Sequence, residues 1–193
     1  MKKIKVVDTN IGDFVCSLYN ERPYNIQSPA AHKKVEEIAS LYSEQFGVKE
    51  NCNAKQLTTA TRLLLKDNML NAECVITGAN FLISNSGTIV LTENEGNILK
   101  ATANAPIHIV VAGIDKLIAS IDELSVLLPL SSYYEPQKNI SSFYNFINKP
   151  LEENGNVQKL YLVLLNNNRT NILAKEKQRE ILSCIQCGAC SEV

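Results

Sequence analysis

The sequence lacks any strong imbalance of charge and any long apolar run. Its 19 Lys and Arg residues nearly balance its 20 Asp and Glu residues, giving a formal net charge of -1. This balance offers no electrostatic case for binding nucleic acid or an anionic membrane surface. No apolar stretch reaches the roughly 18 residues that a membrane helix needs, and the basic start, MKKIKVVDTN, leads into no signal-peptide core. These absences predict a cytoplasmic protein without a membrane span.

Familiar catalytic and nucleotide-binding motifs are missing as well. The chain has no Walker loop, no Gly-x-Gly-x-x-Gly fingerprint, no Ser-His-Asp order, no internal repeat and no low-complexity segment. What remains is an ordinary globular composition, with 45% hydrophobic and 20% charged residues among 193 positions. This length is enough for one domain with a full core.

Strand signals are concentrated in the middle of the chain, over residues 74–115. Short apolar runs lie at residues 75–77, 81–83, 88–92 and 108–112. The turn sequence Asn85-Ser86-Gly87 separates the second run from the third, and Asn and Gly adopt positive φ readily. These two runs therefore predict a β-hairpin.

Helical periodicity accounts for much of the remainder. We expect helices after the N-cap Asn10, from Ser28 or Pro29 to Gly47, over 53–71, from Asp115 to a stop before Pro129, over 140–147, and from Asn171 or Ala174. Further strands are expected at residues 4–8 and 157–165. Alternating strands and helices predict an α/β layered domain, and the central hairpin makes its mostly parallel sheet mixed.

A polar segment, residues 93–97, follows the third apolar run directly. Open α/β sheets bind ligands at strand ends, so this segment is a candidate cleft. A polar loop between strands is the alternative interpretation. Glu93 and Glu95 would share a face of an extended strand, and Glu95 is the candidate general base or nucleophile. Solvated loop carboxylates are the alternative for both.

Other polar residues complete the candidate site. His108 could carry a proton, since its ordinary pKa lies near neutrality; a histidine bonded to backbone is the alternative. Arg169 follows a strand end and could hold a carboxylate bidentately, unless it forms a surface ion pair. The expected substrate-binding residues are Asn80, Thr88, Glu93, Asn97 and Arg169.

Three of the six cysteines are clustered in the tail, CIQCGACSEV, with the spacing Cys-x2-Cys-x2-Cys. This spacing is that of a ferredoxin-type run, whose fourth cysteine would follow three residues later. Cys184, Cys187 and Cys190 are therefore candidate ligands of an iron–sulfur cluster. We expect residues 181–193 to be the start of a truncated 4Fe-4S motif, with a cluster held only in a longer protein and none in this fragment.

The runs TGANFLISNSGTIVLTENEGN, PIHIVVAGIDKL, LLNNNRTNILA and CIQCGAC, in that order, resemble the lactate-utilisation iron–sulfur protein family, called lactate utilisation protein B. The segments VVDTNIGDFV and SPAAHKK are similar to it too. The family's Asp-Asn-Gly-Arg reads Asn166-Asn167-Asn168-Arg169 here, so the arginine stays and the turn glycine does not.

The resemblance implies a LUD domain over residues 1–180 that lacks N-terminal helices, with a three-layer α/β/α fold like that of NagB, RpiA and CoA transferases. It implies a subunit with two 4Fe-4S clusters that works with sibling subunits to oxidise L-lactate, or a related 2-hydroxy acid, to pyruvate. The fragment alone would be inactive. A non-catalytic module that docks subunits or binds a small molecule, and a CoA-transferase-like enzyme, are the alternatives.

Overall fold

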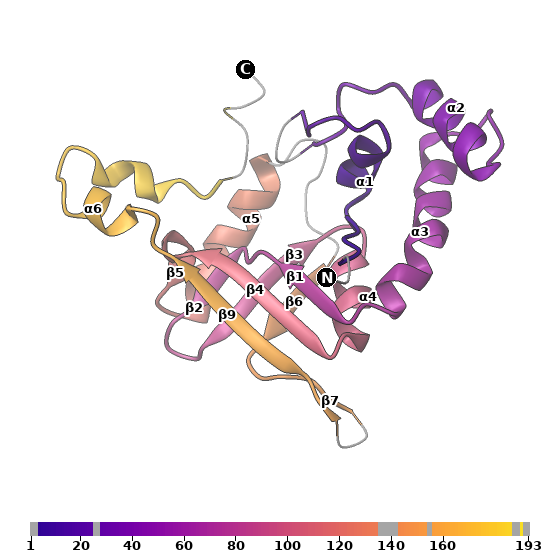
Figure 1. Ribbon diagram of the computed structural model, residues 1–193. Coiled ribbons are helices and arrows are strands. Elements are labelled where there is room, and N and C mark those ends of the chain that lie inside the picture. The colour runs from indigo at the N-terminus through magenta and orange to yellow at the C-terminus, as the bar shows by residue number, and fades with distance from the viewer. Residues whose placement is uncertain (1–3, 25–27, 135–142, 154–155, 187–189, 191–193) are drawn as a thin grey trace. The chain divides into compact units, whose positions relative to one another are not determined.

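The computed structural model describes residues 4–24, 28–134, 143–153, 156–186 and 190 (Figure 1). It divides into two compact units, Met1–Asn71 and Ala72–Val193. The first unit is helical and the second contains all the described strands. Each unit is built around cores of its own.

The described residues of the first unit form three helices: α1 (Ile11–Leu18), α2 (Val35–Phe46) and α3 (Ala54–Leu70). Their core contains Val15, Ala39, Tyr42 and Leu57. The expected end signals at Asn10 and Gly47 are confirmed, and α3 begins with a cap of the same kind as α1. Asn10 caps α1 by accepting from the backbone N–H groups of Gly12 and Asp13, Gly47 ends α2 at φ 68°, and Asn53 caps α3.

Two expectations for this unit are wrong. No strand forms over residues 4–8, which lie within the described residues, and the side chains of Ile4 and Val6 are 88% and 81% exposed. A strand needs a neighbour to bond its backbone, and this segment pairs with none of the described strands. Helix α2 begins at Val35 rather than at residue 28 or 29.

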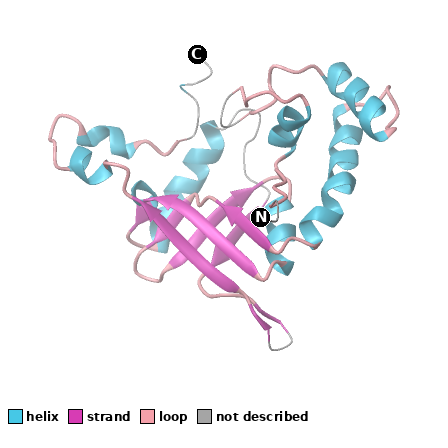
Figure 2. Cartoon of the chain, in the orientation of Figure 1, coloured by secondary structure: helices cyan, strands magenta, loops and turns pink. Residues whose placement is uncertain are grey.

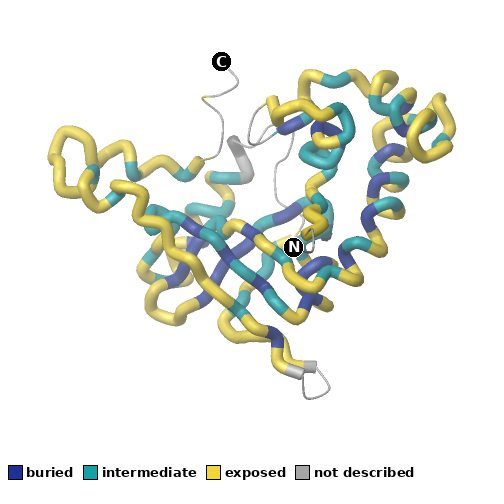
Figure 3. Tube along the Cα trace, in the orientation of Figure 1, coloured by how far each residue is buried: buried dark blue, intermediate teal, exposed yellow. Residues whose placement is uncertain are grey.

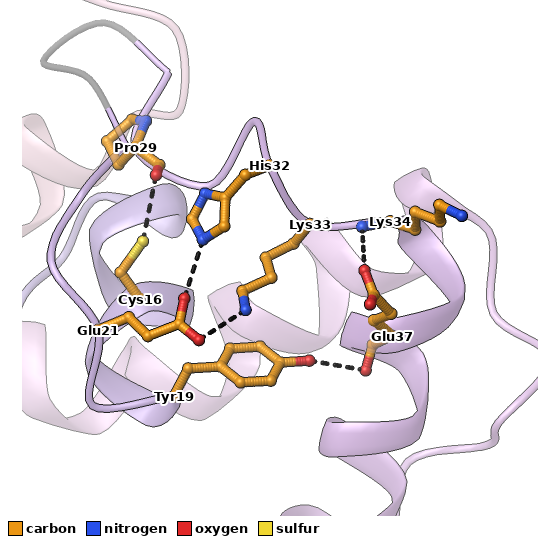
Figure 4. A network of polar contacts seen from close by, with 8 residues as sticks. All are labelled: Cys16, Tyr19, Glu21, Pro29, His32, Lys33, Lys34 and Glu37. Atoms are coloured by element: carbon orange, nitrogen blue, oxygen red, sulfur yellow. Dashed lines mark hydrogen bonds and ion pairs between the residues drawn. The ribbon is translucent and has the colours of Figure 1, made fainter.

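The late start of α2 follows from a polar network that holds the preceding segment against the end of α1 (Figure 4). The Glu21 carboxylate binds His32 Nε2 at 2.9 Å and Lys33 Nζ at 2.8 Å, and the Lys33 ammonium also lies over the Tyr19 ring. Cys16 Sγ donates to the carbonyl of Pro29 at 3.2 Å. These side-chain contacts hold residues 29–32 as turns instead of a first helical turn.

In the second unit, the strands that the structure describes form two main sheets and a small ribbon (Figure 2). The parallel sheet has the order β1 (Cys74–Thr77), β4 (Ile107–Gly113), β9 (Lys159–Leu165). The mixed sheet has the order β5 (Leu117–Ile118), β2 (Phe81–Ile83), β3 (Thr88–Glu93), β6 (Phe143–Ile147). The ribbon pairs β7 (Glu152–Glu153) with β8 (Asn156–Val157).

Helices of two kinds connect these strands. The α-helices are α4 (Asn97–Asn104), α5 (Leu124–Tyr134) and α6 (Arg169–Leu173). The 3-10 helices are η1 (Ile114–Lys116), η2 (Ile121–Glu123) and η3 (Arg179–Ser183). The α/β class is thus confirmed, with the strands divided between a parallel and a mixed sheet.

The mixed sheet is covered on both faces. Leu82, Ile89 and Leu91 pack with Val110 and Ala112 of the parallel sheet. On the opposite face, a second cluster joins Phe81, Ile83, Val90 and Leu124. The expected hairpin is confirmed here, since Phe81 pairs with Val90 and Ile83 with Thr88 in antiparallel register.

Four expectations for this unit are wrong. Residues 143–147 form strand β6 rather than a helix, because their aromatic and β-branched side chains pair along β3. Residues after Asp115 pair with β2, and a capping box between Ser120 and Glu123 begins the helical segment instead. Pro129 lies inside α5.

The last helix, expected to start at Asn171 or Ala174, starts at Arg169. Residues 140–142, the first part of the helix expected over 140–147, lie outside the described residues.

Candidate functional site

The carboxyl ends of β4 and β9 meet at one edge of the parallel sheet, where Gly113 pairs with Leu165. Asp115 follows β4 in η1, and Arg169 begins α6 after β9. The Arg169 Nε atom forms an ion pair with Asp115 Oδ1, and the two side chains are 24% and 7% exposed. This edge is where open α/β sheets bind ligands.

Local backbone features bring these two side chains together. A Cβ atom at Gly113 would collide with the Asp115 carboxylate and crowd the Arg169 guanidinium. Asn167 and Asn168 have φ values of 41° and 64°. Asparagine tolerates this left-handed conformation, so it replaces a turn glycine here. Asn166 Oδ1 accepts from the Thr170 backbone N–H at 3.0 Å and fixes the start of α6.

Lys116 adds a second cation beside the ion pair. Burial lowers the pKa of its ammonium below the usual lysine range. The negative charge of Asp115 and, less strongly, that of the Cys184 thiolate act against this shift. The positive charge of Arg169 adds to it. The edge therefore gathers two cations, one carboxylate and one thiol.

The cysteine segment is bonded to this same edge. Gln186 Nε2 donates to Asp115 Oδ2 at 3.0 Å, and the Gln186 backbone N–H donates to Cys184 Sγ at 3.4 Å. Cys184 and Cys190 are both exposed, and Cys187 lies outside the described residues. Among the described residues, no group of three or more His, Cys, Asp or Glu side chains is placed to hold a metal ion.

The cysteine thiols of this segment are the kind of ligand that an iron–sulfur cluster uses. Thiolates ligate such clusters, and backbone N–H donation to sulfur, as at Cys184, is one of the contacts that tune them. The expected ligands Cys184, Cys187 and Cys190 supply three sulfurs for a cluster that takes four. The segment therefore fits as part of a cluster site, and its assignment as 4Fe-4S ligands stays a prediction.

Glu93 is buried, with 6% of its surface exposed, and its carboxylate caps α4. Its two oxygens accept the backbone N–H groups of Ile98 at 2.8 Å and Leu99 at 3.0 Å. Asn145 Nδ2 donates to Oε1 at 2.8 Å. A carboxylate at a helix N-terminus is favoured by the unpaired N–H groups there. The polar segment thus begins a helix, α4, that the sequence pattern did not reveal.

The other residues expected around this segment lie close to it along the chain. Asn80 Oδ1 accepts the Thr92 backbone N–H at 2.8 Å, and Asn97 is the first residue of α4. Thr88, at the hairpin, shares a 2.8 Å hydrogen bond with Ser86. Glu95 lies beyond the end of β3 and is half-buried, so it does not share a strand face with Glu93. Their expected roles stay predictions.

His108 points into the core between the two sheets. It is 1% exposed, and its Nε2 atom lies 2.9 Å from Thr77 Oγ1. Burial lowers the pKa of its imidazole below the usual histidine range. Its side-chain hydrogen bond is with Thr77 and not with Glu93 or Arg169, and its expected catalytic role stays a prediction.

Sequence reasoning missed Asp115, Lys116 and Gln186 as site residues. Asp115 and Lys116 directly follow the strand that ends at Gly113, which is the signal that identified Arg169 after β9. Asn145 was missed as a partner of Glu93 because its segment was expected to be helical. Long-range pairing alone brings these residues to their partners.

Comparison with known proteins places the chain in a family. Residues 2–163 match the LUD domain. The chain therefore belongs to the LUD domain family, as the resemblance indicated. It is 32% identical over 193 residues to lactate utilization protein B of Geobacillus sp. (strain WCH70). It is 30% identical over 190 residues to an uncharacterized electron transport protein of Escherichia coli (strain K12).

These alignments cover 98% and 97% of this chain but only 40% of each relative, so the chain spans less than half the length of the proteins it matches. A solved DUF162 family protein from Deinococcus radiodurans is also similar, at 14% identity and a TM-score of 0.38, covering 80% of this chain and 93% of that one. Within the described residues, no helix is both long and apolar enough to span a membrane.

Proposed function

We propose that this chain is the LUD-domain portion of a lactate-utilisation protein. In this proposal it belongs to an iron–sulfur oxidoreductase subunit that, with sibling subunits, oxidises L-lactate or a related 2-hydroxy acid to pyruvate in the cytoplasm. The family match and the names of its relatives support the lactate-utilisation part. The cysteine spacing supports the iron–sulfur part.

One observation carries the proposal: the cysteine segment is bonded to the sheet edge that holds Arg169 and Lys116. The Gln186 side chain reaches the carboxylate that pairs with Arg169. A cation pair at this edge can bind the carboxylate of a small acid, because guanidinium binds carboxylates through parallel N–H donors. Thiols suited to an electron-transfer centre are thereby tethered to a carboxylate-binding edge.

The residues take distinct parts in this proposal. Arg169 and Lys116 orient the substrate carboxylate, and Asp115 holds the Arg169 guanidinium in place before the substrate binds. Cys184, Cys187 and Cys190 supply thiolates to a cluster, which when bound supplies one-electron transfer. Oxidation of a 2-hydroxy acid to a 2-oxo acid releases two electrons and two protons. Glu95 and His108 stay the candidate proton carriers predicted from the sequence.

The test is to purify the complete gene product without oxygen, count its iron, and add L-lactate while recording visible absorption, with and without the sibling subunits. We expect bound iron and lactate-dependent bleaching. Arg169→Lys should raise KM for lactate about tenfold with less effect on kcat, because the bidentate fork is lost. Arg179→Lys, in exposed η3, is the matched control and should leave KM unchanged.

Iron-free protein, or iron that L-lactate does not reduce under either condition, would contradict the proposal. That result would favour the docking module, for which the structure offers one specific observation. Strand β9 exposes large apolar side chains, among them Tyr161 at 51% and Leu164 at 49%. Exposed apolar surfaces of this kind often bind other polypeptides.

A further inference from the structure

The Arg169 guanidinium already has a carboxylate partner within the chain. Asp115 contacts its Nε atom, and the Asn166 carbonyl accepts from Nη1 at 3.4 Å. An incoming carboxylate that approaches Nε would therefore meet Asp115 there, whose buried Oδ1 atom accepts no hydrogen bond among the described residues. A ligand that binds Arg169 bidentately through Nε must compete with Asp115 for it.

Asp115 also connects the arginine to the cysteine segment. Its Oδ1 atom pairs with Arg169, and its Oδ2 atom accepts from Gln186. The same glutamine donates its backbone N–H to Cys184 Sγ. The Asp115 carboxylate thus contacts both Arg169 and the segment that carries Cys184. If Asp115 moves, both contacts change.

The charges at this edge favour a second anion. Arg169 and Lys116 bring two positive charges, while Asp115 brings one negative charge. An added carboxylate would therefore meet two basic side chains and one carboxylate at this edge. The Arg169 side chain is 24% exposed, so solvent and small ligands reach it.

We propose that the Asp115–Arg169 ion pair is a displaceable latch: a small carboxylate competes with Asp115 for Arg169, and its binding loosens residues 184–186 from the sheet edge. The identity of that carboxylate as a 2-hydroxy acid rests on the proposed function, but the competition itself does not. The latch couples occupancy of the carboxylate site to the mobility of residues 184–186, and so to the reactivity of the already exposed Cys184 thiol, which accepts the Gln186 backbone N–H.

The test uses the labelling rate of the Cys184 thiol in the 193-residue chain carrying Cys187→Ser and Cys190→Ser. The rate with a maleimide is read by mass spectrometry, in sodium L-lactate and in sodium chloride of equal ionic strength. We expect lactate to accelerate labelling several-fold. Asp115→Asn keeps an oxygen that can accept from Gln186 but loses the ion pair, so lactate should no longer change its labelling rate.

Two variants accompany this measurement. Gln186→Ala removes the bond to Asp115 but leaves the ion pair, and it should label fast with and without lactate, which covers the case that Asp115→Asn does not fold. Asp122→Asn, at an exposed aspartate in η2, is the matched control and should behave like the parent.

A labelling rate that lactate does not change, or that Gln186→Ala does not raise, would overturn the latch. This outcome is separate from the fate of the proposed function. Lactate-dependent bleaching in the complete protein without faster labelling would leave the oxidoreductase standing and the latch rejected. Faster labelling without bleaching would support the latch and reject lactate oxidation.

Discussion

Strands β3 and β9 are both apolar, yet they differ sharply in burial. Five of the six residues of β3 are buried, whereas in β9 only Leu160 is even half-buried (Figure 3). The sequence of β9, KLYLVLL, is the more hydrophobic of the two. Hydrophobicity therefore predicts that a segment becomes a strand, but the neighbouring elements determine whether that strand is buried.

The neighbours explain the difference. β3 pairs with β2 and β6, and clusters of apolar side chains cover both faces of its sheet. β9 pairs with β4 alone among the described strands. Parallel sheets in α/β proteins are normally covered on both faces, but Ile76 and Tyr161, in register across this sheet with Ile109, remain 69% and 51% exposed.

The largest expected effect comes from truncating a buried side chain of β3. Leu91 is 2% exposed and lies in the core between the two sheets. Leu91→Ala should lower the free energy of unfolding by about 2–5 kcal/mol, because it removes buried methyl groups and leaves a cavity. Urea unfolding followed by circular dichroism measures this change.

Leu164→Ala is the matched control on β9, where the side chain is 49% exposed. Its cost should stay below about 1 kcal/mol, since much of the side chain already contacts water. Equal costs for the two leucines would break the comparison between the strands and show that β9 is covered in solution.

The second prediction concerns the buried end of β3. Glu93→Gln should destabilise the chain by about 1–3 kcal/mol, because one acceptor oxygen of the α4 cap becomes an N–H donor facing other donors. The same urea titration measures it. Glu44→Gln, at an exposed position of α2, should change stability by less than about 0.5 kcal/mol. If Glu93→Gln does not change the free energy of unfolding, the Glu93 carboxylate is not needed as a cap and stays a candidate for a chemical role.

The third prediction uses the buried imidazole of His108. Its folded-state pKa lies below the unfolded value of about 6.5, so both states are neutral above that pH. As the pH falls below 6.5, the unfolded chain binds a proton that the folded chain does not. Stability should then fall by at most about 1.4 kcal/mol per pH unit until the folded pKa is reached.

Urea midpoints between pH 5 and 8 measure this dependence. His108→Gln keeps a hydrogen-bonding group beside Thr77 but cannot titrate, so the slope assigned to His108 should vanish in it. If the variant keeps the full slope, the pH dependence arises at other groups and His108 is not held neutral by the core.

The elements predicted correctly from the sequence are those fixed by local contacts. The N-cap at Asn10, the helix end at Gly47 and the hairpin at Asn85-Ser86-Gly87 each depend on residues within a few positions of one another. The errors at residues 4–8 and 143–147 concern strands, whose existence depends on partners far along the chain. Local pattern cannot supply those partners.

The same division applies to the site. Arg169 was identified because it follows a strand, which is a local signal. Its partner Asp115 and the contact from Gln186 join segments that only the parallel register of β4 and β9 brings together. Glu93 was singled out as a polar residue after a strand, but its bonds to α4 depended on a helix that its sequence pattern had not indicated.

The smallest expected effect gives the sharpest form of the comparison between the strands. Val163→Thr on β9 exchanges a methyl for a hydroxyl at a position 41% exposed, and its free energy of unfolding should change by less than about 0.5 kcal/mol. Val90→Thr makes the same exchange on β3 at a position 0% exposed, and burying a hydroxyl there should cost about 1–3 kcal/mol. Both residues keep a β-branched shape, so strand propensity hardly changes and the difference between the two costs measures burial alone. A cost at Val163 equal to that at Val90 would mean that β9 is buried in solution, by an element that the described strands do not include.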